Sequence, residues 1–359
     1  MLLSIVVVVL VFFGLVMVHE LGHFVVARRN GVRVLEFGIG FPPRLFSTIR
    51  AKTRYSVNLL PIGGFVRLKG EDGENKDPDS FASQGYWKKT KIIMAGVTVN
   101  LLVAYLIFTF LLFVGMPHIL PFTPPSFGPV QPITYSSEGM LVYGVSKDGA
   151  AKVAGLREND HILSVNGEVF DTQSSFSQYL RDHAGQDVRL AISRGGQNLS
   201  VVAKLGSDKS AGVLGVVAER ETYVRYNWWQ APLAAVVVVL RMLWLTLAGF
   251  GALIVGLFTR GQVSDQVAGP IGITALFGQL IHFDWRYSVS LVAALSLSLA
   301  LINSLPIPAL DGGREFVITL QRLGVKIKPH HEQWIHVAGF VLIFALIIII
   351  TIVDITRLR

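Results

Sequence analysis

The chain opens with residues 1–29, MLLSIVVVVLVFFGLVMVHELGHFVVARR. Residues 1–18 carry no charge, the apolar character resumes after His19 and Glu20, and the first basic side chains are Arg28 and Arg29. A cleaved signal peptide places its positive charges before the apolar run, whereas here they follow it. The pattern therefore predicts a retained transmembrane helix over residues 1–27, with its N-terminal end outside the cytoplasm.

The composition extends this prediction to the whole chain. Of the 359 residues, 52% are hydrophobic and only 16% are charged, whereas soluble domains carry about 25% charged residues. The deficit indicates several membrane spans, and the apolar stretches predict further transmembrane helices in residues 92–116, 287–313 and 334–353. The chain has no cysteine, which excludes disulfides, thiolate metal ligands and a cysteine nucleophile.

The charges of the polar loops predict the orientation in the membrane. Residues 28–91 hold 13 Lys and Arg against 6 Asp and Glu, whereas residues 117–227 hold 10 against 11. Because basic loops stay in the cytoplasm, residues 28–91 are expected there and residues 117–227 on the other side. Membrane topology thus accounts for most of the net charge of +8, and no nucleic-acid partner is expected.

The segment expected outside the cytoplasm, residues 117–227, is predicted to form a linker followed by a small domain. Residues 117–132 are proline-rich and predict a linker. Residues 133–227 predict an α+β domain, with one amphipathic helix near Ser174–His183 and the strand-like runs MLVYGV, HILSVNG, DVRLAI and LSVVAKL.

The first predicted span contains a potential metal site. His19 and His23 lie four residues apart, on one face of a helix, with Glu20 beside them. At about 1.5 Å per residue, His19 lies roughly 13 Å before Arg28, inside the hydrocarbon. Ionisable groups at that depth are energetically unfavourable, so their presence there indicates a function. The motif predicts two histidine ligands for a metal and a carboxylate that takes a proton from water.

A catalytic zinc site needs a third protein ligand, and Asp311 is the obvious candidate. It lies in residues 303–313, NSLPIPALDGG, where Pro306 and Pro308 break the helix and Gly312 and Gly313 permit unusual backbone angles. Non-helical backbone at membrane depth is tolerated only where it is buried or lines a watery cavity.

The pair HELGH and NSLPIPALDGG resembles the site-2 protease family, in particular its bacterial RseP-type branch with a single PDZ domain. The stretch FASQGYWKKTKIIMAGVTVNLLVA, residues 81–104, is similar to the segment that leads into the family's second span, although Val97 stands where the family often has proline. Residues 139–167 resemble a PDZ domain. The resemblance implies a polytopic α-helical membrane protein with about four transmembrane helices, a membrane-re-entrant β-hairpin loop and an inserted α+β PDZ domain.

The same resemblance assigns roles to individual residues. It implies one Zn²⁺ per chain held by His19, His23 and Asp311, Glu20 as the catalytic base, and Asn303 as a group that positions substrate or stabilises the oxyanion. In the family the re-entrant loop holds the substrate as an added strand, a role expected here of Gly38, Gly40, Asn58, Gly63, Gly64 and Phe65. Residues expected to shape the site are Gly96, Asn100, Pro306, Pro308 and Gly312.

The disposition of residues 228–258 follows from the proposed metal site. Hydropathy alone favours a span, although Arg241 interrupts it. If this segment crossed the membrane once, Asp311 would lie on the opposite side from His19 and His23. Residues 228–286 are therefore expected to form interfacial amphipathic helices and a loop at the outer surface.

The expected protein is an intramembrane zinc endopeptidase of the bacterial inner membrane, in contact with membrane lipid, with its active site toward the cytoplasm. By resemblance its substrates are transmembrane proteins such as anti-sigma factors and remnant signal peptides, and the PDZ domain is a candidate peptide binder. Two other hypotheses remain at this point. A metal or proton transporter would not need Glu20, and an inactive scaffold would be expected to lack a ligand or the base.

Overall fold

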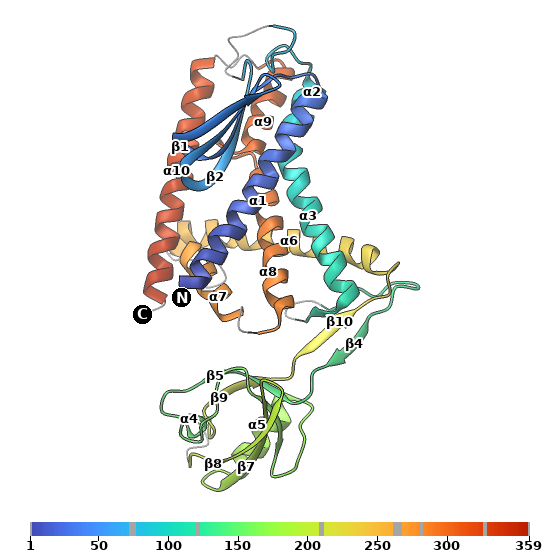
Figure 1. The fold of residues 1–359 in the computed structure, drawn as a ribbon, viewed down its shortest axis with the longest axis vertical. Helices are drawn as coiled ribbons and strands as arrows, with labels where there is room; N and C mark the ends of the chain where they lie inside the picture. The colour runs from blue at the N-terminus through green and yellow to red at the C-terminus, as the bar shows by residue number, and fades with distance from the viewer. Residues whose placement is uncertain are drawn as a thin grey trace. The chain divides into compact units, whose positions relative to one another are not determined.

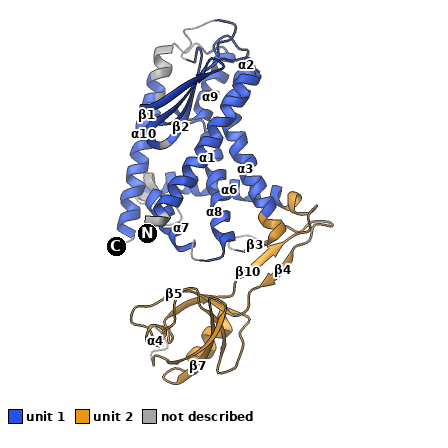
Figure 2. Ribbon diagram, viewed as in Figure 1, with its two compact units in different colours: residues 1–110, 235–359 blue, residues 111–234 orange. Residues whose placement is uncertain are grey.

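The computed structural model describes residues 2–71, 77–118, 123–207, 212–260, 268–280, 283–325 and 329–357. The chain divides into two compact units, drawn in different colours in Figure 2. The helical unit comprises residues 1–110 and 235–359, and the inserted unit comprises residues 111–234. The chain leaves the helical unit within helix α3 and returns to it within helix α6.

Long apolar helices make up most of the helical unit. Its helices are α1 (Leu2–Arg29), α2 (Tyr86–Ile93), α3 (Ala95–Val114), α6 (Ala231–Arg260), α7 (Pro270–Leu280), α8 (Trp285–Ser304), α9 (Asp311–Arg322) and α10 (Pro329–Arg357). Among the described residues, five of these are long and apolar enough to cross a membrane, namely α1, α3, α6, α8 and α10. Four of them coincide with the predicted spans, and α6 is the additional candidate.

Figure 1 shows how these helices are arranged within the helical unit. Helices α1, α3, α8 and α10 run along the long direction of the unit, whereas α6 runs across it. Helices α2 and α9 lie at the same end of the unit as the strands, and both chain termini lie at the opposite end. Helix α7 packs against α1, α8 and α10.

The loop after α1 forms a small β-sheet from two long, bent strands, β1 (Val34–Arg50) and β2 (Thr53–Leu68). Residues 36–39 of β1 are paired on both sides, with residues 64–67 and with residues 54–57, and residues 44–50 pair with residues 53–58. Within the described part of the chain, residues 64–68 therefore form one edge of the sheet. Buried Glu36 joins the strands by accepting hydrogen bonds from Arg44 and Arg67.

The inserted unit has its own hydrophobic core. Its five-stranded sheet has the order β8-β7-β6-β5-β9, with helices α4 (Ala150–Val153) and α5 (Gln173–Asp182). The strands of this sheet are β5 (Met140–Val145), β6 (His161–Val165), β7 (Asp187–Arg194), β8 (Gln197–Lys204) and β9 (Val216–Glu219). A second sheet joins β3 (Met116–Pro117), β10 (Thr222–Arg225) and β4 (Ile133–Ser136).

The predicted fold class, a polytopic helical protein with an inserted α+β unit, is confirmed. The four strand-like runs and the amphipathic helix correspond to β5 to β8 and α5. The helix expected within residues 287–313 ends at Ser304, and a new helix starts at Asp311. The proline pair explains the interruption, since proline cannot donate a helical hydrogen bond and disfavours helical backbone in the preceding residue.

Candidate active site

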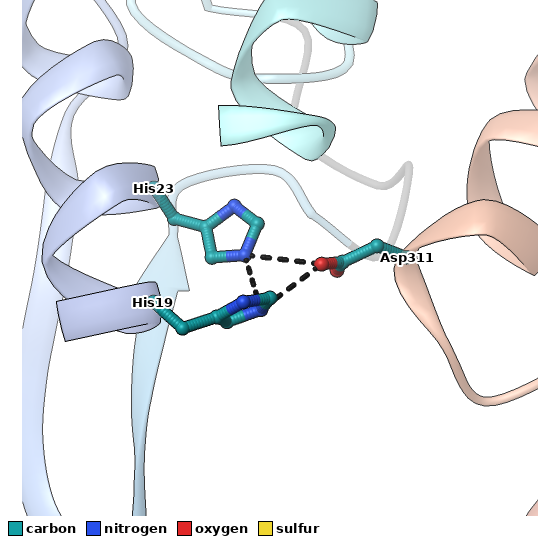
Figure 3. Close-up of side chains that lie close together, drawn as sticks. All are labelled: His19, His23 and Asp311. Atoms are coloured by element: carbon teal, nitrogen blue, oxygen red, sulfur yellow. Dashed lines mark hydrogen bonds and ion pairs between the residues drawn. The ribbon is translucent and has the colours of Figure 1, made fainter. Parts of the chain in front are cut away.

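His19, His23 and Asp311 form a compact cluster in the helical unit. The two histidines lie one turn apart on α1, and Asp311 reaches them from the first turn of α9 (Figure 3). The two Nε2 atoms are 3.1 Å apart, and Asp311 Oδ2 lies 3.0 Å from His19 Nε2 and 3.3 Å from His23 Nε2. All three side chains are largely buried. The fold thus joins two motifs that are about 290 residues apart in the chain.

A neighbouring carbonyl fixes the proton on His23. Its Nδ1 lies 2.8 Å from the carbonyl oxygen of Ile92, which can only accept a hydrogen bond. Nδ1 therefore keeps its proton and donates a hydrogen bond to the Ile92 carbonyl, and in the neutral ring Nε2 carries a lone pair toward the cluster. Such outer contacts orient histidines that bind metals.

Asn100 takes the equivalent place behind His19. Its fully buried amide lies 3.5 Å from His19 Nδ1, and its Oδ1 has no hydrogen-bond partner among the described residues. A half-turn of the amide exchanges its oxygen and nitrogen and lets Oδ1 accept the Nδ1 proton of His19. In that arrangement both histidines present an Nε2 lone pair to Asp311.

The segment before Asp311 adopts an irregular backbone that delivers this side chain to the cluster. Helix α8 ends at Ser304, the chain turns through Pro306 and Pro308, and Ala309 takes a positive φ of 77°. A non-glycine residue in this conformation is strained, and such residues concentrate at functional sites. Asp311 then starts α9, where a carboxylate is favoured by the helix dipole.

The cluster fits a zinc ion. Asp311 Oδ2 is buried without a hydrogen-bond partner among the described residues. With both imidazole protons on Nδ1, this oxygen and the two Nε2 atoms direct lone pairs at one another. This arrangement is repulsive unless a cation lies among them. In a tetrahedral zinc site with bonds of about 2.0 Å, neighbouring ligand atoms are about 3.3 Å apart. The observed separations of 3.0–3.3 Å match that value.

Close packing of α3 on α1 completes the walls of the cluster. A Cβ at Gly96 would lie within 2.6 Å of His19 Nε2, so any side chain there would occupy the position of the ligands. A Cβ at Gly22, on the α1 side, would meet the carbonyl of Ala95 at 2.8 Å. At Gly312, a Cβ would collide with the carbonyls of Ser304 and Leu305. Each position admits only glycine without local movement.

Glu20 faces a pocket that also contains part of the cluster. The pocket has a volume of about 200 Å³ and includes His23, Asp311 and the edge-strand residues Phe65, Val66 and Leu68. Strand β2 passes directly over Glu20, because a Cβ at Gly64 would lie 3.6 Å from Glu20 Cγ. Glu20, two of the three cluster residues and the free strand edge thus line one cavity.

The other glycines predicted to contact substrate shape the sheet. A side chain at Gly38 would overlap the ring of Phe65, and a Cβ at Gly63 would meet Phe41 and Val16. Gly40 has a φ of 78° and turns β1 beside the carbonyl of Leu60.

Asn58 is engaged inside the sheet. Its amide donates to the carbonyls of Ile39 and Gly40 at 3.3 and 2.9 Å. Of the residues predicted to contact substrate, Phe65 alone lines the pocket described above.

Asn303 is not part of this cluster. It lies half-buried in the last turn of α8 and does not line the pocket. Sequence reasoning assigned no role to Ile92, Gly22, Glu71 or Arg314, which the fold brings to the site. Only Gly22 had a local signal, because it lies inside the HELGH motif. Ile92 lies in the stretch that resembles the family's second span, but it acts through its backbone carbonyl, which carries no sequence signal. Glu71 and Arg314 lie outside the motifs identified in the sequence.

The fold and the cluster together define a multi-pass membrane protein whose helical unit contains a His-His-Asp cluster that could hold a metal ion. The chain belongs to Peptidase family M50, whose sequence profile matches residues 7–346. This membership confirms the family inferred from the two motifs.

Curated relatives extend over the whole chain. The protein named zinc metalloprotease RasP of Geobacillus kaustophilus is 27% identical over 99% of this chain and 98% of its own length. RasP of Oceanobacillus iheyensis is 27% identical over 98% of each chain. A solved structure, the PDZ domain of an SdrC-like protein from Listeria monocytogenes, matches 23% of this chain and 90% of its own at 23% identity, with a TM-score of 0.21.

Proposed function

We propose that this protein cleaves transmembrane segments of single-span membrane proteins, with His19, His23 and Asp311 as zinc ligands and Glu20 as the catalytic base. The observation that carries the proposal is the pocket lined by Glu20, by His23 and Asp311, and by the free edge of β2. By analogy with the site-2 proteases, the proposed substrates of this protein include anti-sigma factors and remnant signal peptides.

The enzyme class follows from the family. The chain is a member of a peptidase family, its relatives are named zinc metalloproteases, and its described residues include a cluster that fits Zn²⁺. The zinc metalloprotease predicted from the sequence is thereby confirmed. Bound at the cluster, zinc supplies Lewis-acid chemistry that acidifies water and polarises a peptide carbonyl.

The protein's own side chains would handle protons and ligand geometry. Glu20 would take the proton of the attacking water and deliver it to the amine that leaves when the peptide C–N bond breaks. The Ile92 carbonyl and the Asn100 amide would keep the proton of each imidazole on Nδ1, so that both Nε2 atoms stay available as ligands. Asn303 keeps its proposed role in positioning substrate or stabilising the oxyanion.

The edge of β2 would hold the substrate. A transmembrane helix must unwind before a protease can reach its peptide bonds, and the freed N–H and C=O groups need partners in the hydrocarbon. A free strand edge supplies such partners by β-augmentation. Phe65 and Val66, on that edge, line the pocket with Glu20. A strand added there would run past the catalytic groups.

The exposed apolar side chains of β1 support a re-entrant position for this sheet. The exposed residues of the hairpin include Phe41, Leu45, Phe46 and Ile49, and Phe46 is 74% exposed. Such a surface would be unfavourable in water and suits insertion into lipid. The basic residues after α1 would place this end of the helical unit at the cytoplasmic side of the inner membrane.

The helix directions support four membrane crossings. In Figure 1, α3 ends and α8 begins at the same end of the helical unit, and α6 lies across the other long helices. This arrangement favours an interfacial position of α6 over a fifth crossing. The inserted unit would then lie outside the cytoplasm, where the PDZ domain inferred by resemblance would bind a peptide or limit access by size.

Cleavage of a tagged single-span protein by the purified enzyme in detergent tests the proposed chemistry. We expect a product that disappears with a zinc chelator, returns when zinc is added, and is not formed by Asp311→Asn. Cleavage that persists after verified zinc removal would contradict the metal role. Metal transport into proteoliposomes that does not require Glu20 would favour a transporter instead.

Disulfide cross-linking tests the proposed substrate strand. Because the natural chain has no cysteine, the only enzyme cysteine that can react is the introduced one. A Phe65→Cys enzyme should cross-link to a substrate with one cysteine near the cleavage site. The matched control is Phe46→Cys, which lies in the segment at the opposite side of the same sheet. Equal cross-linking at both positions would argue against binding along the edge of β2.

A further inference from the structure

An ion pair outside the proposed chemistry lines the pocket beside Glu20. Arg314 Nη1 donates to Glu71 Oε1 at 2.5 Å, and Arg314 Nη2 donates to the backbone carbonyl of Glu71 at 3.4 Å. The two side chains are only 26% and 24% exposed. Because solvent screens such a pair less than one on the surface, the interaction is stronger than that of a typical surface ion pair.

Glu71 connects this pair to the strand that covers Glu20. Its other oxygen, Oε2, accepts the backbone N–H of Leu68 at 2.9 Å, at the end of β2. One carboxylate thus joins β2 through Oε2 and α9 through Oε1. Since β2 packs on α1, this carboxylate connects the part of the unit that carries the two histidines with the helix that carries Asp311.

Arg314 is held one helical turn from the metal ligand. Asp311 and Arg314 are the first and fourth residues of α9, and residues at this spacing share a helix face. The guanidinium also lies 5.1 Å from the ring centroid of buried Phe81, a cation–π contact that restricts its movement. Its position therefore constrains both the depth and the rotation of the first turn of α9.

We propose that Glu71 and Arg314 form a positioning pair that holds Asp311 at the place where its carboxylate meets His19 and His23. The pair thereby increases the affinity of the cluster for zinc, without touching the metal or the substrate. The identity of the metal rests on the proposed function. Outer groups that orient metal ligands typically contribute about 10–100-fold in metal affinity.

Separate contacts hold the rest of α9, so loss of the ion pair should not release the helix. The Thr90 hydroxyl donates a hydrogen bond to Glu315 Oε1 at 2.8 Å. The hydroxyl oxygens of Tyr86 and Thr319 are 3.1 Å apart, and the guanidinium carbon of Arg322 lies 4.2 Å from the ring centroid of Tyr86. These contacts fix α9 against α2. Among the described residues, the contact of Arg314 with Glu71 ties the first turn of α9 to the end of β2.

Zinc affinity of the full-length protein in detergent tests this inference. Affinity is measured by competition with a chromophoric chelator, and stoichiometry by elemental analysis. Arg314→Gln and Glu71→Gln should each weaken zinc binding by about 10–100-fold. The double variant should be little weaker than either single variant, because both changes remove the same interaction. Arg314→Lys should restore part of the affinity.

The matched control is Lys69→Gln. This change removes an ion pair on the same loop, in which Lys69 Nζ lies 2.6 Å from Asp79, and the pair does not involve α9. Its zinc affinity should equal that of the parent. Circular dichroism checks that each variant is folded. If Arg314→Gln does not fold, Arg314→Lys takes its place as the test variant.

Three results separate the outcomes. Parent-like zinc affinity in folded Arg314→Gln would overturn the positioning role, and so would fully additive losses in the double variant. Failure of the parent protein itself to bind zinc would instead contradict the proposed function.

Discussion

The two units of the molecule place their apolar side chains differently: those of the inserted unit form its core, whereas many of those in the helical unit face outward. In the inserted unit the core is mainly aliphatic, and its fully buried members include Val142, Val188, Leu190 and Ile192. In the helical unit the apolar side chains of α10 face outward, and Leu342 is 64% exposed. Buried polar residues of the helical unit include His19, Asn100, Ser290, Ser296 and Asp354.

The solvent explains the difference. A domain in water gains stability by burying apolar surface, so its core is apolar. Lipid is as apolar as leucine, so a membrane unit gains nothing from hiding such side chains and can face them outward. Polar groups inside it must then serve a function or a specific bond. His19 belongs to the proposed metal site and Asn100 lies next to it, whereas Asp354 accepts hydrogen bonds from the backbone N–H groups of Gly269 and Gly272.

The largest effect is expected from comparing one carboxylate of each unit, half-buried Glu20 and buried Glu221. Glu20→Gln should lower proteolysis by about 10²–10⁴-fold with zinc still bound, because it removes the general base. Glu221→Gln, a buried carboxylate of the inserted unit, should leave turnover unchanged. The measurement is initial cleavage rate with zinc content determined on each sample. Full activity of Glu20→Gln would contradict the proposed role of Glu20 as the general base.

Leucines in the two units provide the next comparison. Leu190→Ala should destabilise the inserted unit by about 2–5 kcal/mol, since Leu190 is fully buried in its core. Leu342→Ala should change stability little, because its exposed side chain faces lipid in the proposed membrane arrangement. Hydrogen exchange of the intact protein, followed in peptides of β7 and α10, measures both. Equal destabilisation would contradict lipid exposure of α10.

Asn100 tests whether buried polar groups of the helical unit act on the metal. Asn100→Ala should weaken zinc binding by about 10–100-fold, because His19 loses the group that faces Nδ1. Ser290→Ala is the matched control, since this buried hydroxyl donates to the Arg286 carbonyl of its own helix. Chelator competition reports both variants. Loss of zinc affinity in Ser290→Ala would indicate general loosening of the unit.

The smallest effect is expected at helix ends. Thr172 Oγ1 accepts the Ser175 N–H at the start of α5, and Thr172→Ala should cost about 1 kcal/mol. Asp354→Ala should destabilise α7 by more, because water cannot easily replace the carboxylate at its buried N–H groups. Hydrogen exchange of α5 and α7 peptides compares the two. A larger loss of hydrogen-exchange protection in α5 than in α7 would contradict the expectation that water replaces the lost cap more easily at α5 than at α7.

Local sequence patterns are enough to predict several parts of the site. Helical periodicity places His19 and His23 on one face, apolar length predicts four of the long helices, and the two prolines predict the break before Asp311. The strands of the inserted unit also follow from their own alternating patterns. These features depend on residues within a few turns or one strand, which is the range over which backbone preferences act.

Only the tertiary structure decided which distant groups meet. The Ile92 carbonyl behind His23 is 69 residues away in the chain, and Arg314 meets Glu71 across 243 residues. Gly96 shows how closely α3 approaches the histidines, and the pairing of β1 on both sides creates the free edge beside Glu20. Such contacts depend on the packing of whole helices and strands against each other. A backbone carbonyl carries no sequence signal, and a charged side chain does not specify its partner.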